Sequence, residues 1–229
     1  MATSGTTTFN LDLSDIMEEA YELCGLVMRS GYEYRTAKRA LNLIFLEWQN
    51  KGLNLWKIEQ DTITLVAGTS SYAADTSALE IVDAFIRTDA GDTSNQFDQT
   101  LNRISRTQYN HQAKKLTQSK PTQFYVDKGT SGINIVVWST PDSAQTYTLV
   151  YDYIKRIEDI GDYTNATDLP FRFVPCMVSG LAFYLAQTYQ PQMVQPMKLY
   201  HEDELARALA EYGSASSTHI TPKTYYPGA

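Results

Sequence analysis

The sequence predicts an α+β protein: a four-helix body made of two N-terminal and two C-terminal helices, an inserted small antiparallel β module, and an extended C-terminal tail. Three observations predict this fold. Apolar residues recur at helical spacing near the N-terminus, at a spacing of two in the middle of the chain, and at helical spacing again toward the C-terminus. The predicted boundaries are 1–54, 55–155, 156–213 and 214–229.

The composition is typical of a folded protein and unlike that of a dedicated nucleic-acid binder. The chain has 229 residues, of which 43% are hydrophobic, and a formal net charge of −7. A chain of this length buries enough surface to fold without a disulfide or metal. An acidic chain lacks the excess of Lys and Arg that neutralises phosphates, although it can still stand beside DNA. Its 16 Tyr against 8 Phe favour surfaces that a partner covers.

The sequence predicts a protein that folds in a reducing cytoplasm. No stretch approaches the ~18 consecutive apolar residues of a membrane span, so no membrane association is predicted. The opening residues MATSGTTTFN have neither a basic leader nor an apolar run, so no signal peptide is predicted. Cys24 and Cys176 lie far apart in apolar helical patterns. Each is expected to be a reduced core residue rather than half of a disulfide or a metal ligand.

Two helices are predicted before residue 54. The first is expected to begin at Ser14 as its N-cap, with Asp15 and Glu18 in the first turn. Ser30 and Glu33 have the spacing of a capping box for the second helix. Gly52 is a suitable C-terminal stop. The predicted buried stripe of the second helix is Ala37, Leu41, Ile44, Phe45 and Trp48.

The first half of the β module is predicted from residues that alternate between apolar and polar. Residues 62–66 alternate in this way, and residues 70–73 are expected to pair with them across the turn Ala67-Gly68-Thr69. Residues 79–88 are predicted to form another strand. The polar residues 91–96 are expected to form an exposed loop.

The second half of the module is predicted to contain a hairpin and a final strand. Residues 124–127 and 133–138 flank two glycines, which is typical of a hairpin turn. Residues 147–153 alternate cleanly and predict a strand with one buried face. A short polar helix is expected between residues 105 and 118.

Two more helices are predicted after residue 168. Asp168 is the expected cap of the first, which runs over about residues 175–189. The second begins near Val194 and ends at Gly213. One face of the first carries small residues that allow another helix to approach closely. These are Ser179, Gly180, Ala182 and Ala186.

The sequence predicts no catalytic residues, no metal site and no cofactor, and therefore a protein that is not an enzyme. It contains no G-x-S-x-G motif and no glycine-rich phosphate loop. The histidines His111, His201 and His219 do not have metal-ligand spacing. A hydrolase that uses clustered carboxylates is an alternative, although a solvated loop is favoured. The cluster comprises Glu158, Asp159, Asp162 and Asp168.

One basic stretch interrupts the acidic chain. Tyr109, Phe124 and Tyr125 are interspersed among its bases. Three interpretations remain open: a nucleic-acid patch, which is the least favoured, a rim that meets a protein partner, and a solvated face. The bases are Arg103, Arg106, Lys114, Lys115, Lys120 and Lys128.

An ordered set of short motifs resembles a known family. The set runs from TAKRALNL at Thr36 through EWQNKG at Glu47 to GTSSY at Gly68, and continues with DLPFRF at Asp168 and GLAFYLA at Gly180. Two helices, a β insertion and these motifs are similar to the head-to-tail adaptor proteins of short-tailed bacteriophages. These include connector, tail accessory and packaged-DNA-stabilisation proteins. The resemblance covers about residues 11–212.

The resemblance implies a structural protein of the virion neck. Such adaptors form a ring, typically a dodecamer, between the portal protein and the tail nozzle. They continue the DNA channel, help to retain the packaged genome, and dock tail components such as the nozzle, fibres or spikes. Double-stranded DNA passes through without sequence-specific binding. In such a ring, the small-residue face at Ser179 is expected to pack between subunits.

The resemblance also implies that the C-terminal tail grips the portal. Residues 218–229 match that role, and Lys223 is their only base. Anchoring by side chains is therefore favoured over electrostatic docking. The expected docking residues are Ile220, Pro222, Tyr225, Tyr226 and Pro227.

An alternative function is a β-rich binding module on a helical stalk that recognises a carbohydrate or a host surface. Exposed aromatic side chains stack on sugars, and the candidates are Trp138, Tyr147 and Tyr151. Cross-strand tyrosines, however, more often stabilise a sheet.

Overall fold

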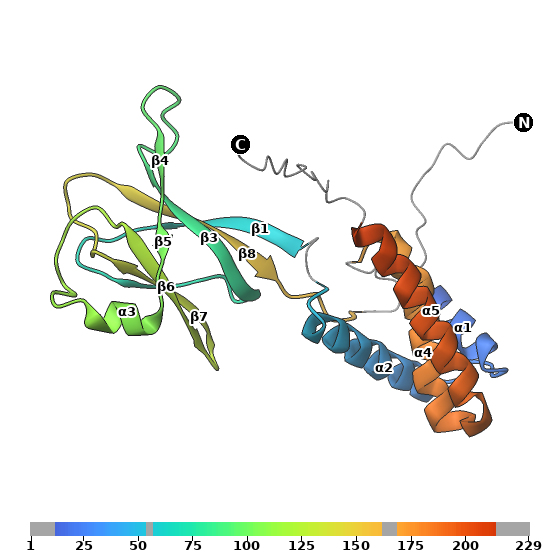
Figure 1. The fold of residues 1–229 in the computed structure, drawn as a ribbon. Coiled ribbons are helices and arrows are strands. Elements are labelled where there is room, and N and C mark those ends of the chain that lie inside the picture. Colours follow the sequence, from blue (N-terminus) through green and yellow to red (C-terminus); the bar gives the residue numbers. More distant parts are fainter. Residues whose placement is uncertain (1–11, 54–56, 162–168, 214–229) are drawn as a thin grey trace, which may run out of the picture. The chain divides into compact units, whose positions relative to one another are not determined.

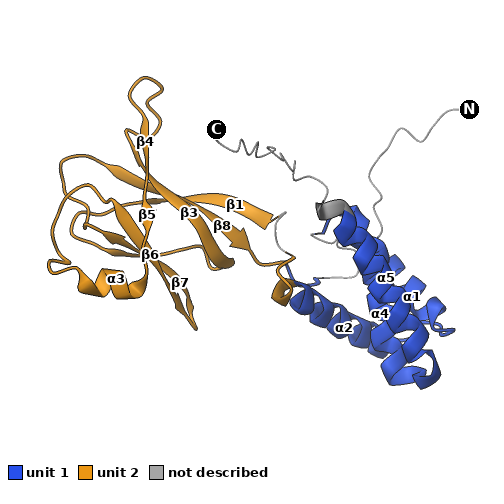
Figure 2. Cartoon of the chain, viewed as in Figure 1, with its two compact units in different colours: residues 1–48, 158–229 blue, residues 49–157 orange. Residues whose placement is uncertain are grey.

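The computed structural model describes residues 12–53, 57–161 and 169–213 of the chain (Figure 1). It confirms the predicted α+β class, with helices at both ends of the sequence and strands between them. Two compact units are present (Figure 2): a helical unit from residues 1–48 and 158–229, and a β unit from residues 49–157. The predicted tail, residues 214–229, lies outside the described residues.

The two N-terminal helices begin at polar capping residues. Helix α1 spans Leu13–Leu23 and is capped by Asp12, so the predicted cap at Ser14 is wrong by two positions. The carboxylate of Asp15 accepts the backbone N–H of Asp12 at 3.3 Å, which satisfies a donor at the helix start. Helix α2 spans Gly31–Asn50. Its predicted capping box is confirmed, because Glu33 Oε2 accepts the Ser30 N–H at 2.8 Å and Ser30 Oγ accepts the Glu33 N–H at 3.4 Å.

The two C-terminal helices complete the helical unit. Helix α4 spans Val174–Tyr189 after the 3₁₀ turn η2, Phe171–Phe173. Helix α5 spans Val194–Gly213 after the 3₁₀ turn η3, Pro191–Met193. Both agree closely with the predicted ranges. None of the helices in the described residues is both long and apolar enough to span a membrane.

Large aromatic side chains hold the helical unit together. Trp48 of α2 is fully buried, and its ring centroid lies 5.7 Å from that of Phe173 and 6.0 Å from that of Phe45. The hydroxyl of Tyr21 donates to the Glu33 carbonyl at 3.0 Å, which ties α1 to the start of α2. The predicted buried stripe of α2 is confirmed, since all five of its residues are buried.

The β unit contains two four-stranded sheets, ordered β1-β8-β3-β4 and β2-β7-β6-β5. Every pairing is antiparallel except the parallel pair β5·β6. A short helix, α3, spans Arg106–His111 within the predicted helical segment. The strands are β1 Ile58–Thr64, β2 Ser71–Ala73, β3 Ala78–Thr88, β4 Phe97–Thr100, β5 Asn102–Arg103, β6 Gln123–Gly129, β7 Gly132–Trp138 and β8 Tyr147–Lys155.

One predicted strand pairing is wrong. The β6–β7 hairpin forms as expected, but β1 pairs with β8, and β2 pairs with β7 in the other sheet. The turn after β1 is held by a distant segment, because the Gly68 N–H donates to the Pro141 carbonyl at 2.9 Å. The two strands are therefore not joined as a hairpin.

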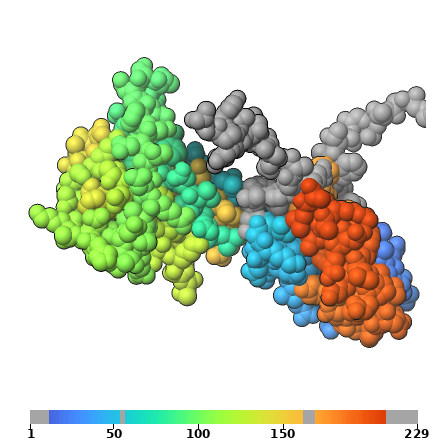
Figure 3. Space-filling view, viewed as in Figure 1, coloured from blue at the N-terminus to red at the C-terminus, as the bar shows by residue number. Residues whose placement is uncertain are grey.

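The two sheets share one hydrophobic core. Side chains from both sheets form a single buried cluster that includes Phe124 and Ile135 from one sheet and Ile81 from the other. On β8, the alternating residues 147, 149, 151 and 153 all belong to this cluster, as the period of two predicts. The loop before β4 is exposed at residues 91–96, also as predicted, and projects from the β unit (Figures 1 and 3).

The hydroxyl of Tyr151 joins three segments of the β unit. It donates to Asp61 Oδ2 on β1 at 2.8 Å and accepts the backbone N–H of Asp75, before β3, at 3.0 Å. The ring itself is fully buried. Burial and the neighbouring Asp61 raise the pKa of this phenol well above its usual range. The hydroxyl therefore remains a neutral donor and acceptor.

Replacement of Tyr151 by Phe is expected to destabilise the β unit by about 1–3 kcal/mol, because the Asp75 N–H loses its acceptor. Urea unfolding followed by far-UV circular dichroism measures this loss. The matched control is Tyr153→Phe, whose hydroxyl donates to Glu59, a carboxylate that also pairs with Lys155 at 3.1 Å. A Tyr151→Phe protein no less stable than the control contradicts the role given to this hydroxyl.

Candidate functional site

The described residues bring together no cluster of three or more side chains suited to hold a metal ion. His111 is exposed on α3, and His201 Nδ1 lies 3.4 Å from Ser179 Oγ in a packing contact. Glu158 and Asp159 are exposed, whereas Asp162, Asp168 and His219 lie outside the described residues. The candidate sites considered below are therefore exposed surfaces that a partner could contact.

Both cysteines are free and buried, as predicted. The Cys24 thiol donates to the Ala182 carbonyl at 3.2 Å. Burial raises the pKa of the Cys24 thiol, and that of Cys176 to about 12. Neither group is poised as a nucleophile, because the reactive species is the thiolate.

The small-residue face of α4 is buried within a single chain. Ser179, Ala182 and Ala186 have no exposed surface. A Cβ added to Gly180 meets His201 Cε1 on α5 at 2.9 Å and Ile44 Cδ1 on α2 at 3.4 Å. The close helix approach predicted for this face is therefore made by the chain's own helices. No surface of these residues is left for contact with a second subunit.

Three of the six bases in the predicted basic stretch are paired with acids of the β unit. Arg103 lies 3.3 Å and Lys128 lies 3.6 Å from the carboxylate of Glu80, and Arg103 also donates to the Ile81 carbonyl at 3.0 Å. Arg106 lies 3.3 Å from Asp127. These pairs cancel much of the positive charge, so the stretch is not a continuous cationic surface.

Two of the remaining bases lie on one exposed loop, residues 113–117, which we call the lysine loop. Lys114 and Lys115 directly precede Leu116, whose surface is 79% exposed, and the loop lines a pocket of about 400 Å³. The indole N–H of Trp138 donates to the Lys114 carbonyl at 3.2 Å, which fixes the loop against β7. An exposed leucine with cations beside it, on a loop that is fixed to a strand, is typical of the rim of a protein-binding surface.

Aromatic rings accompany the loop lysines. The Lys115 ammonium lies 5.5 Å from the centroid of the Tyr109 ring. Lys120, which follows the loop, lies 5.3 Å from the centroid of Phe97, a side chain that is 60% exposed. Of the three aromatic residues that the sequence placed among the bases, only Tyr109 accompanies a loop lysine, because Phe124 and Tyr125 are buried.

Two of the three aromatic residues proposed for sugar binding are buried. Tyr147 and Tyr151 are buried in the β core, and their hydroxyls bond Asp142 and Asp61. Trp138 uses its only N–H on the lysine loop. The prediction that these tyrosines stack on a carbohydrate is therefore wrong.

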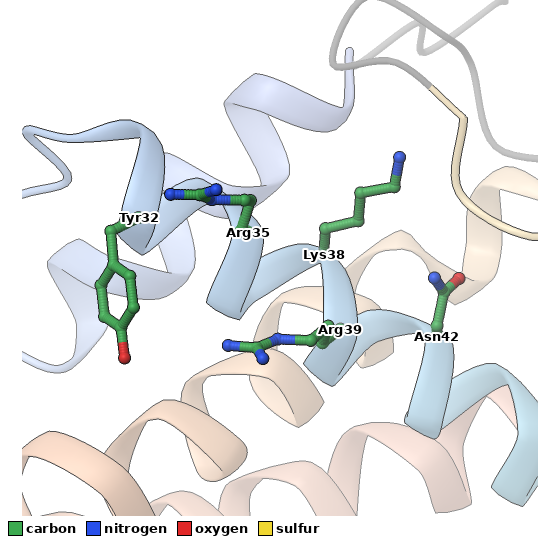
Figure 4. Close-up of a pocket in the computed structure, with 5 residues that line it drawn as sticks. All are labelled: Tyr32, Arg35, Lys38, Arg39 and Asn42. Carbon is green, nitrogen blue, oxygen red and sulfur yellow. The ribbon is translucent and has the colours of Figure 1, made fainter.

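A second basic surface lies on α2 and was not identified from the sequence. Tyr32, Arg35, Lys38, Arg39 and Asn42 line a pocket of about 460 Å³ (Figure 4). The side chains of Arg35 and Arg39 extend to the same side of the helix in that view. The signal in the sequence is the spacing of three bases at i, i+3 and i+4, on the side of the helix away from its apolar stripe.

The expected portal-docking residues, Ile220, Pro222, Tyr225, Tyr226 and Pro227, lie outside the described residues. Comparison with known families nevertheless reaches into this segment. Residues 12–224 match the family model described as SU10 adaptor protein. This match confirms the resemblance to phage adaptors inferred from the motifs. No curated protein matches the chain.

Burial of the thiols predicts slow alkylation of Cys24 and Cys176 by iodoacetamide at pH 8, because both pKa values are raised and both side chains are enclosed. Mass spectrometry before and after addition of urea measures the difference. Rapid labelling of either cysteine in the folded protein contradicts the buried packing of α4.

Proposed function

Because the chain belongs to the SU10 adaptor family, a family of structural phage adaptor proteins, we propose that it joins the phage head to the tail. In this proposal, copies of the chain form a ring, a dodecamer, between the portal protein and the tail nozzle. The ring continues the DNA channel, helps to retain the packaged genome and carries docking sites for tail components. The family match over residues 12–224 is the observation that carries the proposal.

The charge of the chain supports a conduit for DNA. A net charge of −7 repels the phosphate backbone, so double-stranded DNA moves past the ring without sequence-specific binding. The pairing of Arg103, Arg106 and Lys128 with acids lowers the affinity of the β unit for DNA further. The protein is placed in the neck of the virion after it folds in the host cytoplasm.

The two units have separate roles in this proposal. The helical unit builds the ring, and the β unit contacts the nozzle, or fibres and spikes, through the lysine loop. The support for the second role is the exposure of Leu116 at 79% and Phe97 at 60%, together with the loop lysines. Large exposed apolar side chains with cations beside them favour an acidic protein partner.

The C-terminal tail is proposed to dock on the portal. Ile220, Tyr225 and Tyr226 insert into pockets, while Pro222 and Pro227 keep the segment extended and lower the entropy lost on binding. Side-chain insertion is favoured over charge pairing because Lys223 is the only base of the segment 218–229.

Truncation after Gly213 is expected to leave a folded protein that fails to join portal-containing heads, because the docking side chains are removed. Tyr225→Ala/Tyr226→Ala is expected to fail in the same way, while the matched control Lys223→Ala joins normally. Co-sedimentation of purified protein with portal-containing heads measures joining, and circular dichroism verifies the fold. Normal joining by the truncated chain excludes a docking role for the tail.

A further inference from the structure

The outer face of α1 is uniformly acidic. Asp15, Glu18, Glu19 and Glu22 are all exposed, whereas the opposite side of the helix is buried against the helical unit. At 1.5 Å per residue, the four carboxylates span about 10 Å of the helix. None of them forms an ion pair within the described part of the chain.

The outer face of α2 is basic and apolar. Arg35 and Arg39 lie on the side opposite the buried stripe, at helical spacing with three large apolar side chains. These are Tyr32, Leu43 and Leu46, which are 62%, 52% and 54% exposed. Helices rarely leave two leucines and a tyrosine in water on one face unless another surface covers them.

The cations of α2 have no acidic partner within the described residues. Arg35 Nε donates to the Gly31 carbonyl at 3.2 Å and Arg39 donates to Thr36 Oγ1 at 3.4 Å, both within α2. Lys38 adds a third cation to the pocket they line (Figure 4). One helix thus carries unpaired cations and another carries unpaired carboxylates over comparable lengths.

The acidic face of α5 is a poorer match for the cations of α2 than the acidic face of α1. On α5, Asp203 lies 2.6 Å and Glu204 2.7 Å from Arg207, and Glu202 lies 3.7 Å from Lys198. Its acids are therefore already paired with cations of their own helix. The carboxylates of α1 are the ones left to pair with the cations of α2.

We propose that the outer face of α2 is a docking surface for the acidic face of α1 in a second copy of this chain. The arginines pair with carboxylates of α1, and Leu43 and Leu46 are covered by the neighbouring copy. Val27, which is 61% exposed in the segment between α1 and α2, supplies apolar surface to the same contact. This inference rests on the proposed ring and names the surfaces that build it.

The contact repeats from copy to copy. Each chain carries one face of each kind, so a head-to-tail contact leaves an unused α1 face at one end and an unused α2 face at the other. Such a heterologous contact closes into a ring when its rotation divides a full turn. Local complementarity is needed because copies with a net charge of −7 otherwise repel one another.

The test is self-association of the full chain at about 0.15 M salt. At this ionic strength, charges more than about 8 Å apart are largely screened from each other, whereas charges in contact are not. Sedimentation velocity is expected to show species larger than a dimer. Glu18→Lys/Glu19→Lys and Arg35→Glu/Arg39→Glu are each expected to weaken association by about tenfold or more, because like charges then face each other. An equimolar mixture of the two variants is expected to restore it.

Two controls isolate the proposed faces. Glu202→Lys/Asp203→Lys on α5 makes the same change in net charge as Glu18→Lys/Glu19→Lys and is expected to leave association unchanged. A carbodiimide cross-linker added to mixed ¹⁴N- and ¹⁵N-labelled chains is expected to join Lys38 to α1 carboxylates between copies. All the substituted residues are exposed or half-buried, and circular dichroism verifies that the variants are folded.

The proposal is overturned if the wild-type chain forms neither larger species nor these cross-links, or if its association stops at a dimer. It is also overturned if the mixture of the two variants does not restore association, or if the α5 control loses association to the same extent as the α1 variant. A ring in the virion neck that is unaffected by the charge reversals refutes this interface while the adaptor function stands. If the mixture of the two variants restores association but the chain is absent from the virion, the interface stands and the adaptor function is refuted.

Discussion

The antiparallel pairing of β1 with β8 is the constraint on which the rest of the molecule depends. It sets Ile58 opposite Ile154, so the first and last strands of the insertion run side by side. The side chain of Gln49 continues this closure by donating to the Ile157 carbonyl at 3.2 Å. The chain thus leaves the insertion beside the point where it entered. This is how helices separated by more than one hundred residues in sequence belong to one compact unit.

This arrangement gives the chain a separate unit for each of the two kinds of contact proposed above. The helical unit has its own aromatic core around Trp48, and the β unit has its own core between two sheets. The charged faces of α1 and α2 belong to the first unit and the lysine loop to the second. In the proposed adaptor, the contacts between subunits and the contacts with tail components therefore lie on different units of the chain.

The sequence predicted the local elements well, because their signals lie within a few residues of one another. Ser30 and Glu33 located the start of α2, and the alternation of residues 147–153 located β8. Pairings that depend on distant residues were not predictable in this way. The nearby turn at Gly68 suggested that β2 pairs with β1. Instead β2 pairs with β7, and the Gly68 N–H donates to the Pro141 carbonyl, so both contacts are made with residues more than sixty positions away.

The candidate surfaces were predicted less well, for the same reason. The pairing of Arg103 with Glu80 joins residues 23 positions apart, so a run of bases appeared more cationic than it is. The small residues of α4 indicated close packing correctly, but spacing alone does not distinguish a helix of the same chain from one of a neighbour.

The most direct test of the adaptor role is a cryo-electron microscopy reconstruction of the native virion neck. We expect a closed ring of this chain between portal and nozzle. Absence of the chain from the neck, or its presence as isolated copies, contradicts it.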